Sequence, residues 1–177
     1  MTDPVVIPTI APDGAGWRSD VVLDFAKSEL FDRTFQEGME LVEETAAYLD
    51  GAGRQDSRRL DRERALAYAA ESMCLTTRLM QVASWLLVQR AVKEGDMPVA
   101  DACEARYRLA AEPATPPIAP ETAEAMPARL RALLARSERL YERVMHLDRR
   151  MYIDASDTET PHPVLSQMEK LQAAFGR

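Results

Sequence analysis

The stretch from Gly53 to Gly95 constrains the fold most, because the 41 residues between these two glycines include neither glycine nor proline. At the α-helical period its apolar side chains form two stripes about half a turn apart. The first stripe, about 100° wide like an ordinary core-facing surface, comprises Leu66, Ala69, Ala70, Met73, Thr77, Met80, Ser84, Leu87, Val88 and Ala91. The second stripe comprises Tyr68, Leu75, Leu79, Val82 and Leu86. One pair of neighbouring helices cannot bury both faces, so the pattern predicts a long central helix over residues 57–93 with partners on two sides.

Length and composition favour one helical globular domain. A chain of 177 residues can bury about 70% of the surface that its unfolded form exposes. The formal charge of -7, from 29 acidic and 22 basic residues, disfavours an overall electrostatic attraction to nucleic acid or anionic lipid. Cys74 and Cys103 lack CxxC spacing and are expected to be reduced, packed thiols.

No part of the sequence resembles an export signal or a membrane span. Residues 1–10 lack a charged start and a long apolar run. The most apolar window, residues 79–92, is interrupted by polar side chains and falls short of the roughly 20 apolar residues that a span requires. We therefore expect no membrane association and a cytoplasmic location.

The first part of the chain divides at its glycines and prolines. Residues 1–18 contain three prolines and two glycines without a sustained period, which predicts a flexible lead-in. From Phe31 to Leu49, apolar residues fall on one face and acidic residues on the other, as in a one-sided surface helix. Gly51 and Gly53 are expected to end this helix.

The second part is predicted to contain one short and one long helix. Proline at the first turn favours a short helix over residues 98–111. Prolines then make residues 112–127 a stiff connector. Residues 128–152 keep a heptad typical of a bundle helix, formed by Leu130, Leu133, Ser137, Leu140, Val144, Leu147 and Met151. The expected fold class is all-α, with the helical domain at residues 19–154.

Two predicted helices carry opposite charge on their outer faces. Residues 24–50 contain two bases and eight acids, a net charge of -6, whereas residues 129–150 contain seven bases and three acids, a net charge of +4. Neighbouring placement of the two is mildly favourable. Such faces are commonly just solvated, but Arg136, Arg139 and Arg143 lie on one edge and are candidate partner-binding residues.

A polar, proline-containing segment leads to an amphipathic stretch at the end of the sequence, within a predicted tail over residues 155–177. Its apolar residues recur at helical spacing and are Val164, Leu165, Met168, Leu171 and Phe175. Such a segment either docks on the bundle as an extra helix or serves as a recruitment peptide for another protein. We favour the recruitment peptide.

The sequence lacks the patterns that carry catalysis or cofactor binding. His146 and His162 are too far apart to suggest a metal site, and no phosphate loop, dinucleotide fingerprint or nucleophile elbow is present. Glu71 and Arg78 flank the two stripes and suggest a structural polar pair. The arginines of residues 54–64 are diluted by acids, unlike a DNA-binding arm. We expect no enzyme activity, no cofactor, no metal and no nucleic-acid partner.

Two stretches of helix surface resemble a known family. They are "FDRTFQEGMELVEETAAYLDG" at residues 31–51 and "ALAYAAESMCLTTRLMQVASWLLVQRAVKEGDMP" at residues 65–98, and they are similar to the RcdA family, the regulators of CtrA degradation. The resemblance implies a homodimeric three-helix bundle that acts as a proteolytic adaptor. It would link the ClpXP protease, primed by the response regulator CpdR, to cell-cycle cargo such as CtrA, directly or with a further adaptor such as PopA, at the cell pole.

The implied dimer gives the surplus apolar face of the central helix a role. With the first stripe facing the core, the second stripe is expected to form the dimer seam or to pack a helix that supports it. The alternative to an adaptor is a structural or regulatory dimeric scaffold at the cell pole that delivers nothing. A small-molecule site inside the bundle is disfavoured, because the stripes and the heptad offer only Thr77, Ser84 and Ser137 as polar groups.

Overall fold

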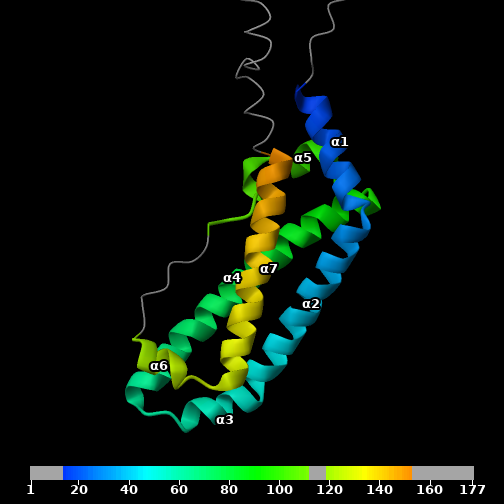
Figure 1. Cartoon of the computed structure of the whole chain (residues 1–177). Helices are drawn as coiled ribbons and strands as arrows, with labels where there is room; N and C mark the ends of the chain where they lie inside the picture. The colour runs from blue at the N-terminus through cyan, green and yellow to red at the C-terminus, as the bar shows by residue number, and fades with distance from the viewer. Residues whose placement is uncertain (1–13, 112–118, 153–177) are drawn as a thin grey trace, which may run out of the picture.

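Three long helices form the body of this computed structural model, which describes residues 14–111 and 119–152 (Figure 1). They are α2 (Glu29–Asp50), α4 (Arg62–Glu94) and α7 (Ala128–Tyr152). The shorter elements are α1 (Gly14–Ala26), α3 (Ala52–Arg58), α5 (Val99–Ala102), the 3-10 turn η1 (Ala105–Tyr107) and α6 (Pro120–Glu124). The described residues contain no strand, so the prediction of an all-α bundle around a long central helix is confirmed.

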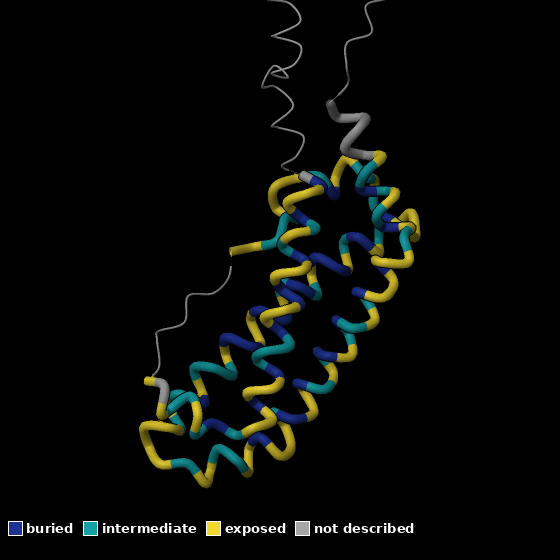
Figure 2. Tube along the Cα trace, in the orientation of Figure 1, coloured by how far each residue is buried: buried dark blue, intermediate teal, exposed yellow. Residues whose placement is uncertain are grey.

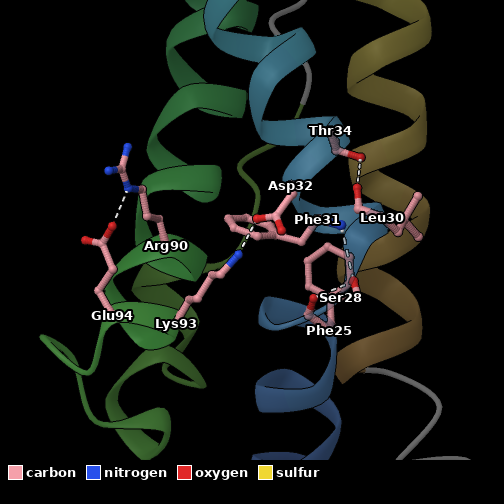
Figure 3. Close-up of polar contacts among 9 residues, drawn as sticks. All are labelled: Phe25, Ser28, Leu30, Phe31, Asp32, Thr34, Arg90, Lys93 and Glu94. Atoms are coloured by element: carbon pink, nitrogen blue, oxygen red, sulfur yellow. Dashed lines mark hydrogen bonds and ion pairs between the residues drawn. The ribbon is translucent and has the colours of Figure 1, made fainter.

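Side-chain caps set where two of the long helices, α2 and α4, begin. The Ser28 hydroxyl accepts a hydrogen bond from the Phe31 backbone N–H at 3.2 Å and starts α2 (Figure 3). Asp61 caps α4 by accepting from the backbone N–H of Arg64 at 2.9 Å. This cap places the start of α4 at Arg62, later than the predicted residue 57, and α3 occupies the residues before it. Gly95, at a φ of 82°, ends α4 in the left-handed conformation that glycine adopts readily.

The core lies between α4 and the pair formed by α2 and α7, as the dark blue positions in Figure 2 show. Phe25, Phe31 and Trp85 form an aromatic cluster near the end where α1 packs, with the rings of Phe25 and Trp85 5.8 Å apart. At the same end, Lys93 of α4 forms an ion pair with Asp32 of α2 (Figure 3). These two contacts join α4 to α1 and to α2.

The heptad helix is predicted correctly. α7 spans residues 128–152, and Leu130, Leu133 and Ser137 are buried along its inner side together with the later heptad residues Leu140, Val144 and Met151. The shorter segments differ from expectation. Residues 98–111 form α5 and η1 rather than one helix, and residues 14–18 belong to α1 rather than to a lead-in.

Candidate functional site

The outer side of α4 exposes a continuous, largely apolar surface, which we call the α4 face. It consists of the exposed residues Leu66, Ala69, Met73, Thr77, Met80, Ser84 and Leu87. The exposed fractions of its four large side chains are 74% for Leu66, 71% for Met73, 65% for Met80 and 52% for Leu87. Monomeric soluble proteins rarely expose a contiguous apolar patch that runs along a whole helix. The α4 face is therefore the candidate interaction surface.

The two stripes of α4 have the reverse of their expected roles. The first stripe was expected to face the core, but seven of its ten residues form the exposed α4 face. The second stripe is buried inside the single chain: Tyr68, Leu75, Leu79, Val82 and Leu86 are at most 7% exposed. This burial excludes the five residues themselves as the dimer seam, whereas the other form of the prediction, that the second stripe packs a helix that supports a dimer, stays a prediction. The reason is geometric, because α2 and α7 both pack against the second stripe and leave the first uncovered.

Charge is absent from the α4 face itself. Glu71 and Arg78 are the only charged residues between Leu66 and Gln89. Arg78 is buried and donates to the Ser137 hydroxyl of α7 at 2.9 Å. Burial raises the pKa of the half-buried Glu71 carboxyl, the nearby Arg78 guanidinium opposes that shift, and Glu138 adds to it. About six turns of α4 thus present an uncharged surface, which association can dehydrate at low cost.

A groove follows one edge of the α4 face. One side of it is α4, with Thr77, Ser84 and Val88, and the other is the segment of residues 105–111, which we call the strap. The groove has a volume of about 490 Å³. Tyr107 and Arg106 of the strap line it, and the Arg106 guanidinium lies 4.8 Å from the centre of the Tyr107 ring.

The strap is anchored by a buried carboxylate. Asp148 of α7 is 5% exposed and accepts two hydrogen bonds from Arg108 Nε, both at 3.0 Å, and one from Arg108 Nη2 at 2.7 Å. Trp85 of α4 donates its indole N–H to the same carboxylate at 2.9 Å. We call these three residues the clasp. It joins α4, α7 and the strap through charge-assisted hydrogen bonds, which are stronger than neutral ones.

A second, apolar groove follows the opposite edge of the α4 face, between α4 and α2. Its volume is about 300 Å³. Val42, Ala46 and Leu49 line it from α2, and Met80 and Ala83 line it from α4. Met80 also borders the groove beside the strap, so it projects between the two grooves.

The predicted arginine edge of α7 is largely used within the chain. Arg143 donates two hydrogen bonds to the Glu37 carboxylate at 2.7 and 3.0 Å, and Arg136 pairs with Glu44. The acidic α2 and the basic α7 are thus neighbours, which is the placement that their opposite charges favour mildly. Arg136 and Arg143 thus join α7 to α2 within the chain, although their side chains are still 42% and 43% exposed, and Arg139 is exposed as well; partner binding by these three arginines stays a prediction.

The other predicted features are distributed as follows. Val164, Leu165, Met168, Leu171 and Phe175 lie outside the described residues. Within residues 14–111 and 119–152, no three metal-ligating side chains come together. Over the same residues, no helix is both long and apolar enough to cross a membrane.

The sequence analysis did not predict the clasp, although the position of Asp148 in the sequence of α7 indicates a buried polar contact. Leu134 and Tyr141 widen the heptad seam of α7, and Asp148 stands seven residues after Tyr141 in the same series. An acidic residue on the inner side of an amphipathic helix needs a buried partner. That signal predicts a polar contact at Asp148, but it does not identify Trp85 or Arg108.

Comparisons with known proteins agree with the resemblance of the helix surfaces. A family described as a protein of unknown function (DUF1465) matches residues 22–175. Among solved structures, RcdA from Caulobacter crescentus CB15 is 65% identical with a TM-score of 0.61, and the match covers 74% of this chain and 98% of that chain. The comparison with curated proteins gave no match. Since the family match spans most of the sequence and the solved chain is covered almost completely, this protein belongs to the RcdA family.

Proposed function

We propose that this protein is an adaptor in regulated proteolysis that works as a homodimer and has no catalytic activity of its own. Membership of the RcdA family supports a role in the degradation of cell-cycle regulators such as CtrA. The observation that carries the proposal is the uncharged, exposed α4 face, which fits association with another protein.

The residue order of the α4 face favours a second copy of the chain as its partner. Leu66, Met73, Met80 and Leu87 are spaced by exactly one heptad, and this series reads the same in both directions. The small residues Ala69, Thr76 and Ala83 repeat the symmetry about nearly the same centre. An antiparallel pairing about a twofold axis near Thr76 would place like side chains level with one another. The small residues would let the two helices approach closely.

The energy available at such a seam is substantial. Fully burying one aliphatic or methionine side chain contributes about 1.5–3 kcal/mol. The four large residues of the α4 face are more than half exposed, and twofold symmetry counts each of them twice. Their burial can therefore offset the entropy lost on association.

The delivery role requires surfaces besides the dimer seam. We propose that the ClpXP protease, primed by CpdR, and a cargo or further adaptor such as PopA bind the remaining surfaces of the dimer in the cytoplasm at the cell pole. Exposed Arg139 and the amphipathic stretch at residues 164–175 are the candidate contacts. The alternative is a polar scaffold, which needs binding surfaces but no coupling to a protease.

A reconstituted degradation assay separates the two functions. Purified ClpXP, CpdR and CtrA are incubated with and without this protein, in the presence and absence of PopA. An adaptor increases the rate of CtrA loss in at least one of these mixtures, and excess protein inhibits delivery by occupying protease and cargo separately. A scaffold leaves every rate unchanged although it still binds one of the components. The second result would contradict the proposed delivery role.

A further inference from the structure

The strap is held more firmly than a surface connection needs to be. Besides the clasp, Tyr141 of α7 donates its hydroxyl to the Ala110 carbonyl at 2.7 Å, and Gln81 of α4 donates its side-chain amide to the Ala111 carbonyl at 3.2 Å. The backbone N–H of Leu109 also points to the Asp148 carboxylate, at 3.4 Å. Asp148 and Tyr141 of α7 and Gln81 of α4 thus hold residues 108–111 of the strap in a fixed position beside α4.

The fixed strap changes the shape of the α4 face. Without the strap, the edge of α4 that carries Thr77 and Ser84 would be a convex helix surface exposed to solvent. With it, this edge becomes a groove with Tyr107 and Arg106 opposite α4. Thr77 and Ser84 belong both to the α4 face and to the groove, so the two surfaces are continuous.

We propose that the strap is the second wall of the dimer seam and that Asp148 is the positioning residue that holds this wall in place. This inference rests on the homodimer of the proposed function. The occupant of the groove is the α4 helix of the second copy. Asp148 acts through Arg108 and does not itself contact the second copy.

Symmetry identifies which part of the second copy enters the groove. The groove runs beside the C-terminal half of α4, from Thr77 to Val88. A twofold axis perpendicular to two antiparallel helices reverses their direction but keeps each edge on its own side. The same edge of the N-terminal half carries Ala70. Ala70 of the partner subunit, flanked by Leu66 and Met73 of the partner subunit, therefore lies level with the groove.

The residue sizes agree with this pairing. Ala70 is small, so it leaves room for Tyr107 of the strap to approach the second helix. Leu66 and Met73 are the two most exposed large side chains of the α4 face. The partner's α4 thus meets the groove with a small residue opposite the wall and two long apolar side chains beside it.

Sedimentation velocity over a dilution series tests the strap. Arg108→Ala removes the link between Asp148 and the strap, while Trp85 still donates to Asp148. Arg131→Ala, an exposed arginine of α7, is the matched control. Arg108→Ala is expected to raise the dimer dissociation constant about tenfold and to speed hydrogen exchange at residues 106–111, whereas Arg131→Ala changes neither. Faster exchange with a wild-type dissociation constant would overturn the inference.

A second variant guards against loss of folding. Tyr107→Ser alters the wall but leaves the clasp intact, and it should weaken the dimer without speeding exchange across the strap. A dimer unaffected by Tyr107→Ser would also overturn the inference. Met80→Glu separates a failure of the strap proposal from a failure of the proposed homodimer. If the wild type is a dimer that Met80→Glu disrupts and both strap variants leave intact, only the strap proposal fails; a monomeric wild type contradicts the proposed dimer as well.

Discussion

Trp85 of α4 and Asp148 of α7, 63 residues apart in the sequence, share a buried hydrogen bond of 2.9 Å, and the same carboxylate holds Arg108 of the strap. One acidic side chain therefore connects the central helix, the heptad helix and the segment that borders the α4 face.

Removing this carboxylate should be costly. Asp148→Ala leaves the indole N–H of Trp85 and the guanidinium of Arg108 without their shared acceptor, and we expect a loss of about 3–5 kcal/mol of unfolding free energy. Asp101→Ala, at an exposed position of α5, should change it by less than about 0.5 kcal/mol. Urea unfolding at one fixed protein concentration measures both. Equal losses in the two variants would show that the clasp is not a stabilising contact.

Two helical glycines should respond differently to alanine. A Cβ at Gly53 would lie 2.8 Å from the Tyr48 carbonyl and 2.5 Å from the Tyr68 hydroxyl, so backbone has to shift. We expect Gly53→Ala to lower the melting temperature, with a cost of about 1–3 kcal/mol. At Gly38 the close atom is Cδ1 of Leu86, at 2.7 Å, the end of a flexible side chain.

The higher helix propensity of alanine, about 0.5–1 kcal/mol, should offset much of the strain in Gly38→Ala. The two substitutions are chemically identical, and both glycines lie in helices. The difference between their melting temperatures therefore reports the local packing. A Gly53→Ala variant that melts at or above Gly38→Ala would contradict the packing around Tyr48 and Tyr68.

Glu71 should make stability depend on pH. Burial raises the pKa of its carboxyl above the ordinary 4.5, so the folded state holds the proton more tightly than the unfolded state. This contribution to stability is complete below the unfolded pKa and is lost as the pH rises through the folded pKa. Glu71→Gln cannot ionise and should lose less stability than the wild type as the pH rises above the ordinary carboxyl pKa of 4.5. Glu142→Gln, on the exposed side of α7, is the control; an unchanged pH slope in Glu71→Gln would refute this assignment.

The ion pair between Glu37 and Arg143 should be reversible. Arg143→Glu places two carboxylates together and is expected to cost about 1 kcal/mol, the upper range for exposed pairs. Adding Glu37→Arg restores opposite charges and should recover most of that loss in thermal melts. If the double variant stays as unstable as Arg143→Glu, the two side chains do not pair in solution.

Hydrophobic periodicity predicted where the helices lie in the sequence better than it predicted which helix faces pack together. The heptad of α7 gave its span of residues 128–152 because all of its heptad residues except the partly buried Leu147 are buried along one side of the helix. On α4 the same method found both stripes but not which one the chain itself covers. That choice depends on the direction in which α2 and α7 return, and this direction is set by tertiary contacts beyond any local window.

Composition offers a signal that separates the two stripes of α4. The buried stripe is built of Tyr68 and branched aliphatic residues, and the buried Trp85 and Arg78 lie near it. The exposed stripe mixes leucine, methionine and valine with alanine, serine and threonine, and its four large exposed residues stand at strict heptad spacing. Strict heptad spacing is typical of a narrow seam between two helices, whereas a chain's own core takes a broader stripe. Methionine is also frequent at adaptable binding surfaces.

The central claim is that the α4 face joins two copies of this chain, and sedimentation equilibrium on two neighbouring variants tests it most directly. Met80→Glu places a charge on the exposed face and should give a folded, fully helical monomer, because the charge is buried twice in a twofold seam. Leu79→Glu places the same charge in the core, where Leu79 is 4% exposed, and should unfold the chain. A wild-type dimer that persists in a folded Met80→Glu variant would contradict the account.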